Sequence, residues 1–220
     1  SLVAGRGEAA NPSIVERMLA PIFHRGPNDE GLAFDREFGA GFRRLSILDL
    51  TPAGHQPMRS QDGRYTLVFN GEIYNFIELR RELVALGHRF ESTGDAEVLL
   101  KSFAQWGSQC VERLNGMWAF LVFDHVTRTL FGSRDRFGIK PLYHFRHGQS
   151  HLFASEIKSI LASGLHSGRV DMATCAGHLL EHRLDENPDT FFEGIEQLPP
   201  AHNFELSRDG SYRQWCYWTL

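Results

Sequence analysis

Two polar side chains of opposite chemical character flank a glycine in the stretch Phe69-Asn70-Gly71-Glu72-Ile73-Tyr74-Asn75. Asn70 offers an amide N–H donor and Glu72 a carboxylate, between an apolar strand-like run and a predicted helix. An asparagine amide beside a glycine N–H can hold an oxyanion, and a glycine lets a ligand approach closely. The motif therefore indicates an acyl-transfer site. The structural alternative is an ordinary Asn-Gly turn, and the motif alone leaves both open.

Helical periodicity predicts the elements that would position these groups: helices over residues 14–22, 75–86 and 96–106. Asn75 and Glu78 have the spacing of a capping box at the start of the second helix. Asp95 is a natural N-cap for the third helix. The Asn70 motif would then lie beside the amino end of the second helix, with Asp95 at the mouth of the third.

Short β-rich runs separated by turn residues predict strands over 39–50, 65–70, 117–124, 129–133, 142–145 and 151–154. The run 118–123 is continuously apolar, which favours a sheet covered on both faces, with helices outside and sheets inside. Short polar loops at 124–128, at 146–150 and around 208–210 are typical of antiparallel hairpins. We therefore expect an α/β (α+β) fold in which antiparallel sheets form the centre.

Composition narrows the class of partner. A chain of 220 residues with 42% hydrophobic content is long enough for one large domain. The formal net charge of −4, with no basic stripe, excludes an obvious nucleic-acid surface and favours a small molecule. The three cysteines are far apart, so neither a disulfide framework nor a metal pair is predicted. Because no apolar run approaches membrane-spanning length, we expect a soluble, cytoplasmic protein without membrane contact.

Histidines supply one competing motif. His178, Glu181 and His182 fit the H-x-x-E-H pattern of some zinc peptidases, which places two ligands on one helix face. The surrounding sequence supplies no third ligand, so we expect no metal site. His144, His147 and His151 fall in a predicted hairpin, where solvated or capped side chains are expected.

A series of motifs carries a family resemblance over nearly the whole chain. Besides the Asn70 motif, the series comprises His24-Arg25-Gly26-Pro27-Asn28, residues 42–47, 94–98, 114–120, 134–143, 153–158 and 192–200. In this order and spacing they resemble the glutaminase domain of glutamine-dependent asparagine synthetases, which are class II glutamine amidotransferases. The resemblance implies one domain over residues 1–220, with the N-terminal-nucleophile hydrolase fold: a four-layer αββα sandwich of two antiparallel sheets.

The resemblance also implies site roles for a glutamine substrate. Asn70 and the Gly71 N–H would hold the oxyanion of the tetrahedral intermediate. Arg44 would bind the α-carboxylate of glutamine, and Ile47, on the same run, is a further expected substrate-binding residue. Glu72 and Asp95 would bind the α-ammonium group. The structural alternatives are a surface arginine for Arg44 and a plain helix cap for Asp95.

The front of the chain departs from the family, whose mature sequence begins with a cysteine that is the nucleophile and whose α-amino group is the base. Ser1-Leu2-Val3 stands here instead. Since Val3 to Gly7 resembles the end of the family's first strand, we expect that Ser1 and Leu2 are cloning residues and that the N-terminal cysteine strand is lacking. A fragment without the thiol would be inactive.

The resemblance implies that this chain is the glutaminase domain of an asparagine synthetase. It would need no cofactor itself, and the released ammonia would pass to aspartate in a covalently linked synthetase domain that uses ATP and magnesium and is absent from this chain. Two alternatives stay open: a different acceptor, such as a sugar, polysaccharide precursor or peptide, or a non-hydrolysing scaffold as in β-lactam synthetase-like enzymes. A homodimer is compatible with all of these.

Overall fold

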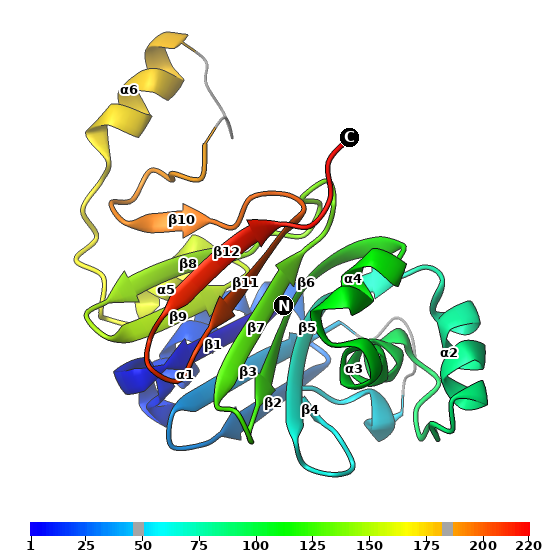
Figure 1. The fold of residues 1–220 in the computed structure, drawn as a ribbon. Helices are drawn as coiled ribbons and strands as arrows, with labels where there is room; N and C mark the ends of the chain where they lie inside the picture. Colours follow the sequence, from blue (N-terminus) through cyan, green and yellow to red (C-terminus); the bar gives the residue numbers. More distant parts are fainter. Residues whose placement is uncertain (46–50, 182–186) are drawn as a thin grey trace.

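Two antiparallel sheets packed face to face form the centre of the molecule, in a computed structural model that describes residues 1–45, 51–181 and 187–220 (Figure 1). Sheet A contains, in spatial order, β10 (Ile195–Gln197), β8 (Tyr143–His147), β9 (Ser150–Ala154), β1 (Leu2–Arg6), β3 (Phe38–Arg44) and β2 (Asp29–Phe34). Sheet B contains β12 (Tyr212–Cys216), β11 (His202–Leu206), β7 (Thr129–Arg134), β6 (Gly116–Asp124), β5 (Tyr65–Ile73) and β4 (Met58–Arg59).

Helices cover the outer faces of both sheets. On sheet A lie α1 (Pro12–Leu19) and α5 (Ile157–Ala162), and on sheet B lie α2 (Phe76–Ala85), α3 (Asp95–Trp106) and α4 (Cys110–Arg113) (Figure 1). Short 3₁₀ turns occupy Gly7–Ala10, Ala20–Arg25, Pro52–Gly54 and Gly107–Gln109. This is the predicted four-layer αββα arrangement.

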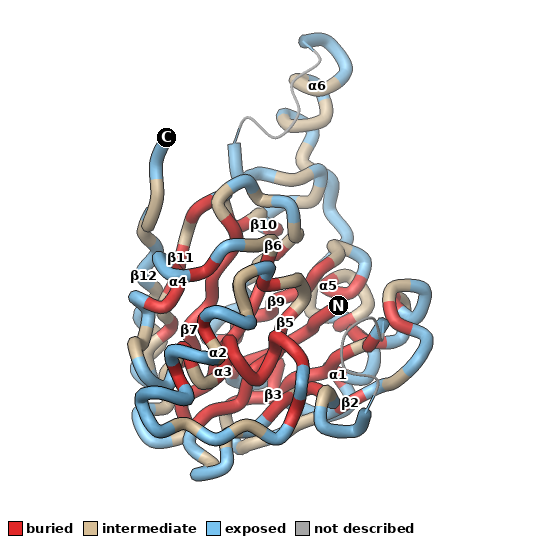
Figure 2. Tube along the Cα trace, turned by 90° about the vertical axis from the view of Figure 1, so that its right-hand side faces the viewer, coloured by how far each residue is buried: buried red, intermediate tan, exposed pale blue. Residues whose placement is uncertain are grey.

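Apolar side chains of both sheets meet in the middle layer. Phe38 of sheet A stacks on Phe123 of sheet B with ring centroids 4.6 Å apart, and Phe153 stacks on Phe204 at 4.7 Å. Figure 2 shows the strands of this layer as the buried part of the molecule. Burial of such large aromatic side chains is the main force that holds the two sheets together.

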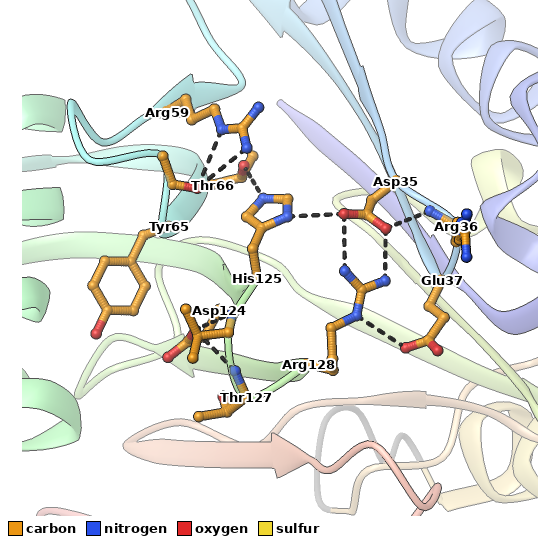
Figure 3. A network of polar contacts seen from close by, with 12 residues as sticks. Asp35, Arg36, Glu37, Arg59, Tyr65, Thr66, Asp124, His125, Thr127 and Arg128 are labelled. Atoms are coloured by element: carbon orange, nitrogen blue, oxygen red, sulfur yellow. Dashed lines mark hydrogen bonds and ion pairs between the residues drawn. The ribbon is translucent and has the colours of Figure 1, made fainter.

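A polar network also joins the two sheets, at the turns between β2 and β3 and between β6 and β7 (Figure 3). Arg128 donates to both carboxylate oxygens of Asp35, at 2.9 and 2.6 Å, and to Glu37 at 3.2 Å. His125 lies 3.0 Å from Asp35. The Arg128 guanidinium, above all, holds the pKa of the Asp35 carboxyl well below its usual range.

Helix α6 (Met172–Glu181) is the exception to this packing. It projects away from the sandwich, and none of its residues is buried (Figures 1 and 2). Its apolar side chains include Leu179 and Leu180, which are 74% and 79% exposed. In the described segments, no helix combines the length and apolar character needed to cross a bilayer.

The predicted strands are all present, with ends that differ by a few residues; β3 ends at Arg44, and 46–50 lie outside the described residues. The first strand, which we expected the chain to lack, is also present as β1. It is paired on both sides, with β3 and β9, and Leu2 faces Phe42 of β3 and is fully buried. Leu2 is therefore a core residue, and the expectation that Ser1 and Leu2 are cloning residues stays a prediction.

Two cap predictions were wrong because other parts of the chain compete for the same side chains. The Asn75 side chain makes no cap bond to α2; it accepts from Asn115 N and donates to Arg113 O, both at 2.9 Å. Gly94, not Asp95, is the N-cap of α3. The predicted cap of α1 is correct, since Asn11 accepts from the Ser13 N–H at 3.0 Å.

The expectation for the hairpin histidines was wrong for two of the three. His147 is exposed, but His151 is only 2% exposed, and the His151 and His144 rings stack on each other. They lie in the β8–β9 hairpin against Tyr212 of β12.

Candidate functional site

A pocket of about 330 Å³ opens where the two sheets and α3 meet. Every predicted site residue that the structure describes lines it: Arg44 from β3, Asn70, Gly71 and Glu72 from β5, and Asp95 from α3. Ile47 lies outside the described residues. The sequence therefore identified groups that are distant along the chain but adjacent in space.

Residues 69–73 of the Asn70 motif belong to strand β5, opposite β6, so Asn70-Gly71 is not a turn. The Asn70 Nδ2 atom is buried and has no hydrogen-bond partner among the described residues. A buried donor without a partner costs free energy unless a ligand supplies the acceptor. Asn70 therefore presents a free N–H group to whatever occupies the pocket. The helix predicted from about residue 75 begins at Phe76, directly after the motif.

The register of the sheet directs the Gly71 N–H away from β6. Trp118 stands opposite Gly71, and its backbone N–H and C=O both bond Asp135 on the far side, at 3.2 and 2.9 Å. Because both backbone groups of a residue in an antiparallel strand point to one side, Gly71 and Trp118 are not a hydrogen-bonded pair. A Cβ at Gly71 would lie 2.2 Å from Met117 O, so only glycine fits there.

The neighbouring N–H groups show where the Gly71 N–H points. Those of Phe69 and Ile73, two residues to either side, bond Gln56 Oε1 at 2.7 Å and Asp95 Oδ2 at 2.9 Å. Gln56 and Asp95 both line the pocket. The Gly71 N–H, which shares their side of β5, therefore faces the pocket between them. Together with Asn70 Nδ2 it forms a pair of donors suited to an oxyanion.

The same pocket also holds charged side chains, namely Arg44, Glu72 and Asp95. Arg44 is 8% exposed and donates to Thr51 O at 3.2 Å. Glu72 and Asp95 contribute two carboxyl groups, and burial raises the pKa of Asp95 above its ordinary value although the Ile73 N–H bond opposes this. One guanidinium and two carboxyl groups in one pocket match the α-carboxylate and α-ammonium groups of an amino acid. Arg43 binds outside the pocket, to Glu30 and over the Phe23 ring.

Ser1 also lines the pocket. It is 6% exposed, its α-amino group donates to Arg43 O at 2.8 Å, and its Oγ accepts a short hydrogen bond from Arg25 Nε. Burial, and then the positive charges of Arg25 and Lys140, lower the pKa of this amino group to about 4. Ser1 is therefore a pocket residue, and its being a cloning residue stays a prediction.

Sequence reasoning left Arg25 and Lys140 unassigned, although both line the pocket. Arg25 belongs to the segment 24–28, which from the sequence alone could either order the site or simply end a helix. Lys140 belongs to the motif 134–143, whose place beside Ser1 depends on pairing across the fold. The only sequence signal for these two side chains was that both fall in motifs of the family resemblance, and that resemblance gave them no role.

The described residues of the zinc-peptidase motif, His178 and Glu181, lie on α6 and do not line this pocket. His178 contacts the ring of Phe191, at 5.3 Å between centroids, and His182 lies outside the described residues. Among the described residues, no three His, Cys, Asp or Glu side chains come together in a way that could hold a metal ion.

Comparison with known proteins identifies the family of this chain. A family model described as glutamine amidotransferase domain matches residues 2–218. The chain is 40% identical to asparagine synthetase [glutamine-hydrolyzing] 3 of Bacillus subtilis over 94% of its own length and 34% of the relative's. It is 33% identical to a putative asparagine synthetase [glutamine-hydrolyzing] of Methanocaldococcus jannaschii (94% and 43%), and 34% identical to amidase chry2 of Gibberella zeae (94% and 30%).

The chain thus spans roughly a third of the length of these relatives. Among solved structures, the glutamine phosphoribosylpyrophosphate amidotransferase of B. subtilis, complexed with ADP and GMP, matches with a TM-score of 0.75 at 18% identity. That match covers 100% of this chain and 49% of the other. At this identity the likeness supports the fold alone.

Proposed function

Because the chain belongs to the glutamine amidotransferase domain family, we propose that its pocket binds glutamine and directs chemistry at the side-chain amide. The observation that carries this proposal is the unpaired Asn70 Nδ2 beside the Gly71 N–H, in the same pocket as Arg44, Glu72 and Asp95. Arg44 would bind the α-carboxylate, and the two carboxyl groups the α-ammonium. The amide carbonyl oxygen would then lie at the two donors, which strengthen as it becomes an oxyanion.

The nucleophile would come from position 1. Ser1 Oγ lies in the pocket with the donors, so its attack on the amide carbon would release ammonia and leave an ester that water hydrolyses to glutamate. A hydroxyl is a much weaker nucleophile than a thiolate. We therefore expect glutamine binding with slow hydrolysis.

Replacing Ser1 by cysteine tests this directly. Glutamine binding would be measured by calorimetry and glutamate release by a coupled assay, for the chain, Ser1→Cys and Ser1→Ala. We expect all three to bind glutamine, and Ser1→Cys to release glutamate at least 100-fold faster than Ser1→Ala. Absence of glutamine binding in all three would refute the proposed substrate.

Ser1 also favours a second candidate, a glutamine-binding domain that does not hydrolyse its ligand. If Ser1→Cys binds glutamine but its turnover stays at the level of Ser1→Ala, that candidate replaces the first. The same assay therefore decides between them.

For the whole protein, we propose that ammonia from this domain serves amide formation in a linked synthetase domain that uses ATP and magnesium. The relatives named asparagine synthetases support aspartate as the acceptor. The similarity to amidase chry2 keeps a different acceptor, such as a sugar, polysaccharide precursor or peptide, as the alternative. We also propose a cytoplasmic location, because all three cysteines are free thiols. We further propose that the protein forms a homodimer.

A further inference from the structure

The carboxylate of Glu156 gathers three basic side chains beside the pocket. Its Oε1 lies 3.0 Å from Arg25 Nη1 and 3.0 Å from His24 Nε2, and its Oε2 lies 2.9 Å from Lys158 Nζ. Burial alone would raise the pKa of Glu156, but the hydrogen bonds from Lys158, Arg25 and His24 outweigh it and hold the pKa below its ordinary value. Glu156 is thus a negatively charged group that does not line the pocket but contacts two residues that do, His24 and Arg25.

Arg25 connects this carboxylate to the pocket. Its guanidinium uses Nη1 for Glu156 and Nε for the Ser1 hydroxyl. The guanidinium group is planar and rigid, so fixing Nη1 also fixes the direction in which the Nε–H points. The Arg25 side chain is 29% exposed, and without the carboxylate it would gain access to other rotamers.

The residue before Glu156 holds the backbone of the same segment. Ser155 Oγ accepts from Leu2 N at 3.1 Å, and Ser155 N donates to Leu2 O at 3.0 Å. The two residues that follow β9 therefore each act on position 1. Ser155 fixes the strand that presents Ser1, and Glu156 fixes the arginine that bonds its side chain.

We propose that Glu156 is a positioning residue, which orients Arg25 so that its Nε–H holds the position-1 side chain toward Asn70 and Gly71. Glu156 does not line the pocket and would not touch glutamine. The proposal rests on the proposed function for its chemical consequence, but the link between Glu156, Arg25 and Ser1 is testable without any substrate.

The first test measures that link directly. Exchange of the Arg25 Nε–H proton with water is followed in ¹H–¹⁵N spectra, with the resonance assigned by its loss in Arg25→Lys. We expect at least tenfold faster exchange in Glu156→Ala and a smaller acceleration in Glu156→Gln, which keeps the size and one acceptor oxygen. Glu82→Ala is the matched control, because it removes a similar 2.8 Å bond to Arg113 on the surface. Unchanged exchange in both Glu156 variants would overturn the proposal.

The second test measures turnover of glutamine in the Ser1→Cys background. Glu156→Ala is expected to lower kcat about tenfold or more while the glutamine Kd changes less than twofold, and Glu156→Gln to recover part of the loss. In an Arg25→Ala background the same change should cost less than twofold, because the two residues act as one unit. Equal losses in both backgrounds would show that Glu156 does not act through Arg25, and would overturn the proposal. Loss of glutamine binding in Ser1→Cys itself, with the exchange result intact, would instead count against the proposed substrate.

Discussion

His144 Nε2 lies 2.9 Å from His151 Nδ1, and the two imidazole rings stack with centroids 5.1 Å apart and planes 6° from parallel. The contact joins neighbouring strands of sheet A, and the His144 ring also stacks on Phe153 and Tyr212. A hydrogen bond between two imidazoles requires that one facing nitrogen carries no proton. The pair is therefore compatible with neutral rings and is disrupted when both become protonated.

We predict that acid weakens the fold through this pair. Burial, and then nearby positive groups, lower the pKa of His144 to about 3 and of His151 to about 4. The unfolded chain takes up protons near pH 6.5, so this stabilisation is complete above pH 6.5 and is lost as the pH falls toward 4. The loss is up to ~1.4 kcal/mol per pH unit for each histidine.

Urea unfolding at pH 7, 6 and 5 would measure this slope. The double variant His144→Phe/His151→Phe keeps the aromatic stack and removes both titrating groups, so its free energy of unfolding should depend less on pH over this range. Parallel pH profiles for the two proteins would contradict the role of the pair. Asp35 does not obscure the comparison, because its pKa is held far below this range.

Asn70→Ala should change activity and stability in opposite directions. The change removes a buried donor that has no partner in the described structure, so the free energy of unfolding should stay the same or rise by about 1 kcal/mol. Glutamate release in the Ser1→Cys background should fall about 100- to 1000-fold, since one oxyanion donor is lost. Thermal unfolding and the coupled assay check both halves. A destabilised variant with full turnover would mean that Asn70 is a structural residue.

Arg44→Ala and Arg43→Ala form a matched pair on one strand. Only Arg44 lines the pocket, whereas the Arg43 side chain binds Glu30 and lies over Phe23. Losing the charge-assisted bonds to the α-carboxylate should weaken glutamine binding about 100-fold in Arg44→Ala, but less than threefold in Arg43→Ala. If the proposed linked synthetase domain is present, Arg44→Ala should spare synthesis driven by free ammonia. Equal losses with both nitrogen sources would be inconsistent with a glutamine clamp.

Asp135→Ala should be among the most destabilising single changes in the chain. The carboxylate is fully buried and accepts from the backbone N–H groups of Trp118, Phe137, Ile139 and Lys140, at 3.0 to 3.2 Å. Removing it leaves these donors without an acceptor, which we expect to cost about 3–5 kcal/mol. Asp135→Asn, which keeps one acceptor oxygen, should cost less. Denaturant unfolding of both variants measures the difference, and similar values would show that the charge and not the geometry matters.

The sequence was informative where function depends on the residue type itself. The family resemblance named Arg44, Asn70, Glu72 and Asp95, and the structure brings all four to one pocket, while their roles stay predictions. The β-rich runs predicted the strands that carry the first three, and helical periodicity predicted α3, which carries Asp95. Local pattern reasoning failed for Asn75 and Asp95 as helix caps. A cap pattern describes only local partners, and here Asn115 and Ile73, from other segments, take those side chains.

Contacts across the fold were beyond sequence reasoning. Nothing in the pattern around Ser155 and Glu156 shows that they lie beside Leu2 and Arg25. That placement depends on β9 pairing with β1, which local periodicity does not encode. The histidine pair was missed for the same reason, since the burial of His144 and His151 depends on Tyr212 of the distant β12.

The pocket is lined by Arg44 of sheet A and by Ser1, which directly precedes strand β1 of that sheet, together with the Asn70 to Glu72 segment of sheet B. A molecule bound there acts as a noncovalent cross-link between the two halves of the sandwich, and neither half alone can form the binding site. Ligand affinity and sheet-to-sheet packing are therefore thermodynamically linked. A substitution at Phe38 or Phe123, deep in the aromatic layer, would therefore lower the affinity for the ligand although neither side chain contacts it. A saturating ligand would in turn partly restore the lost stability of the fold.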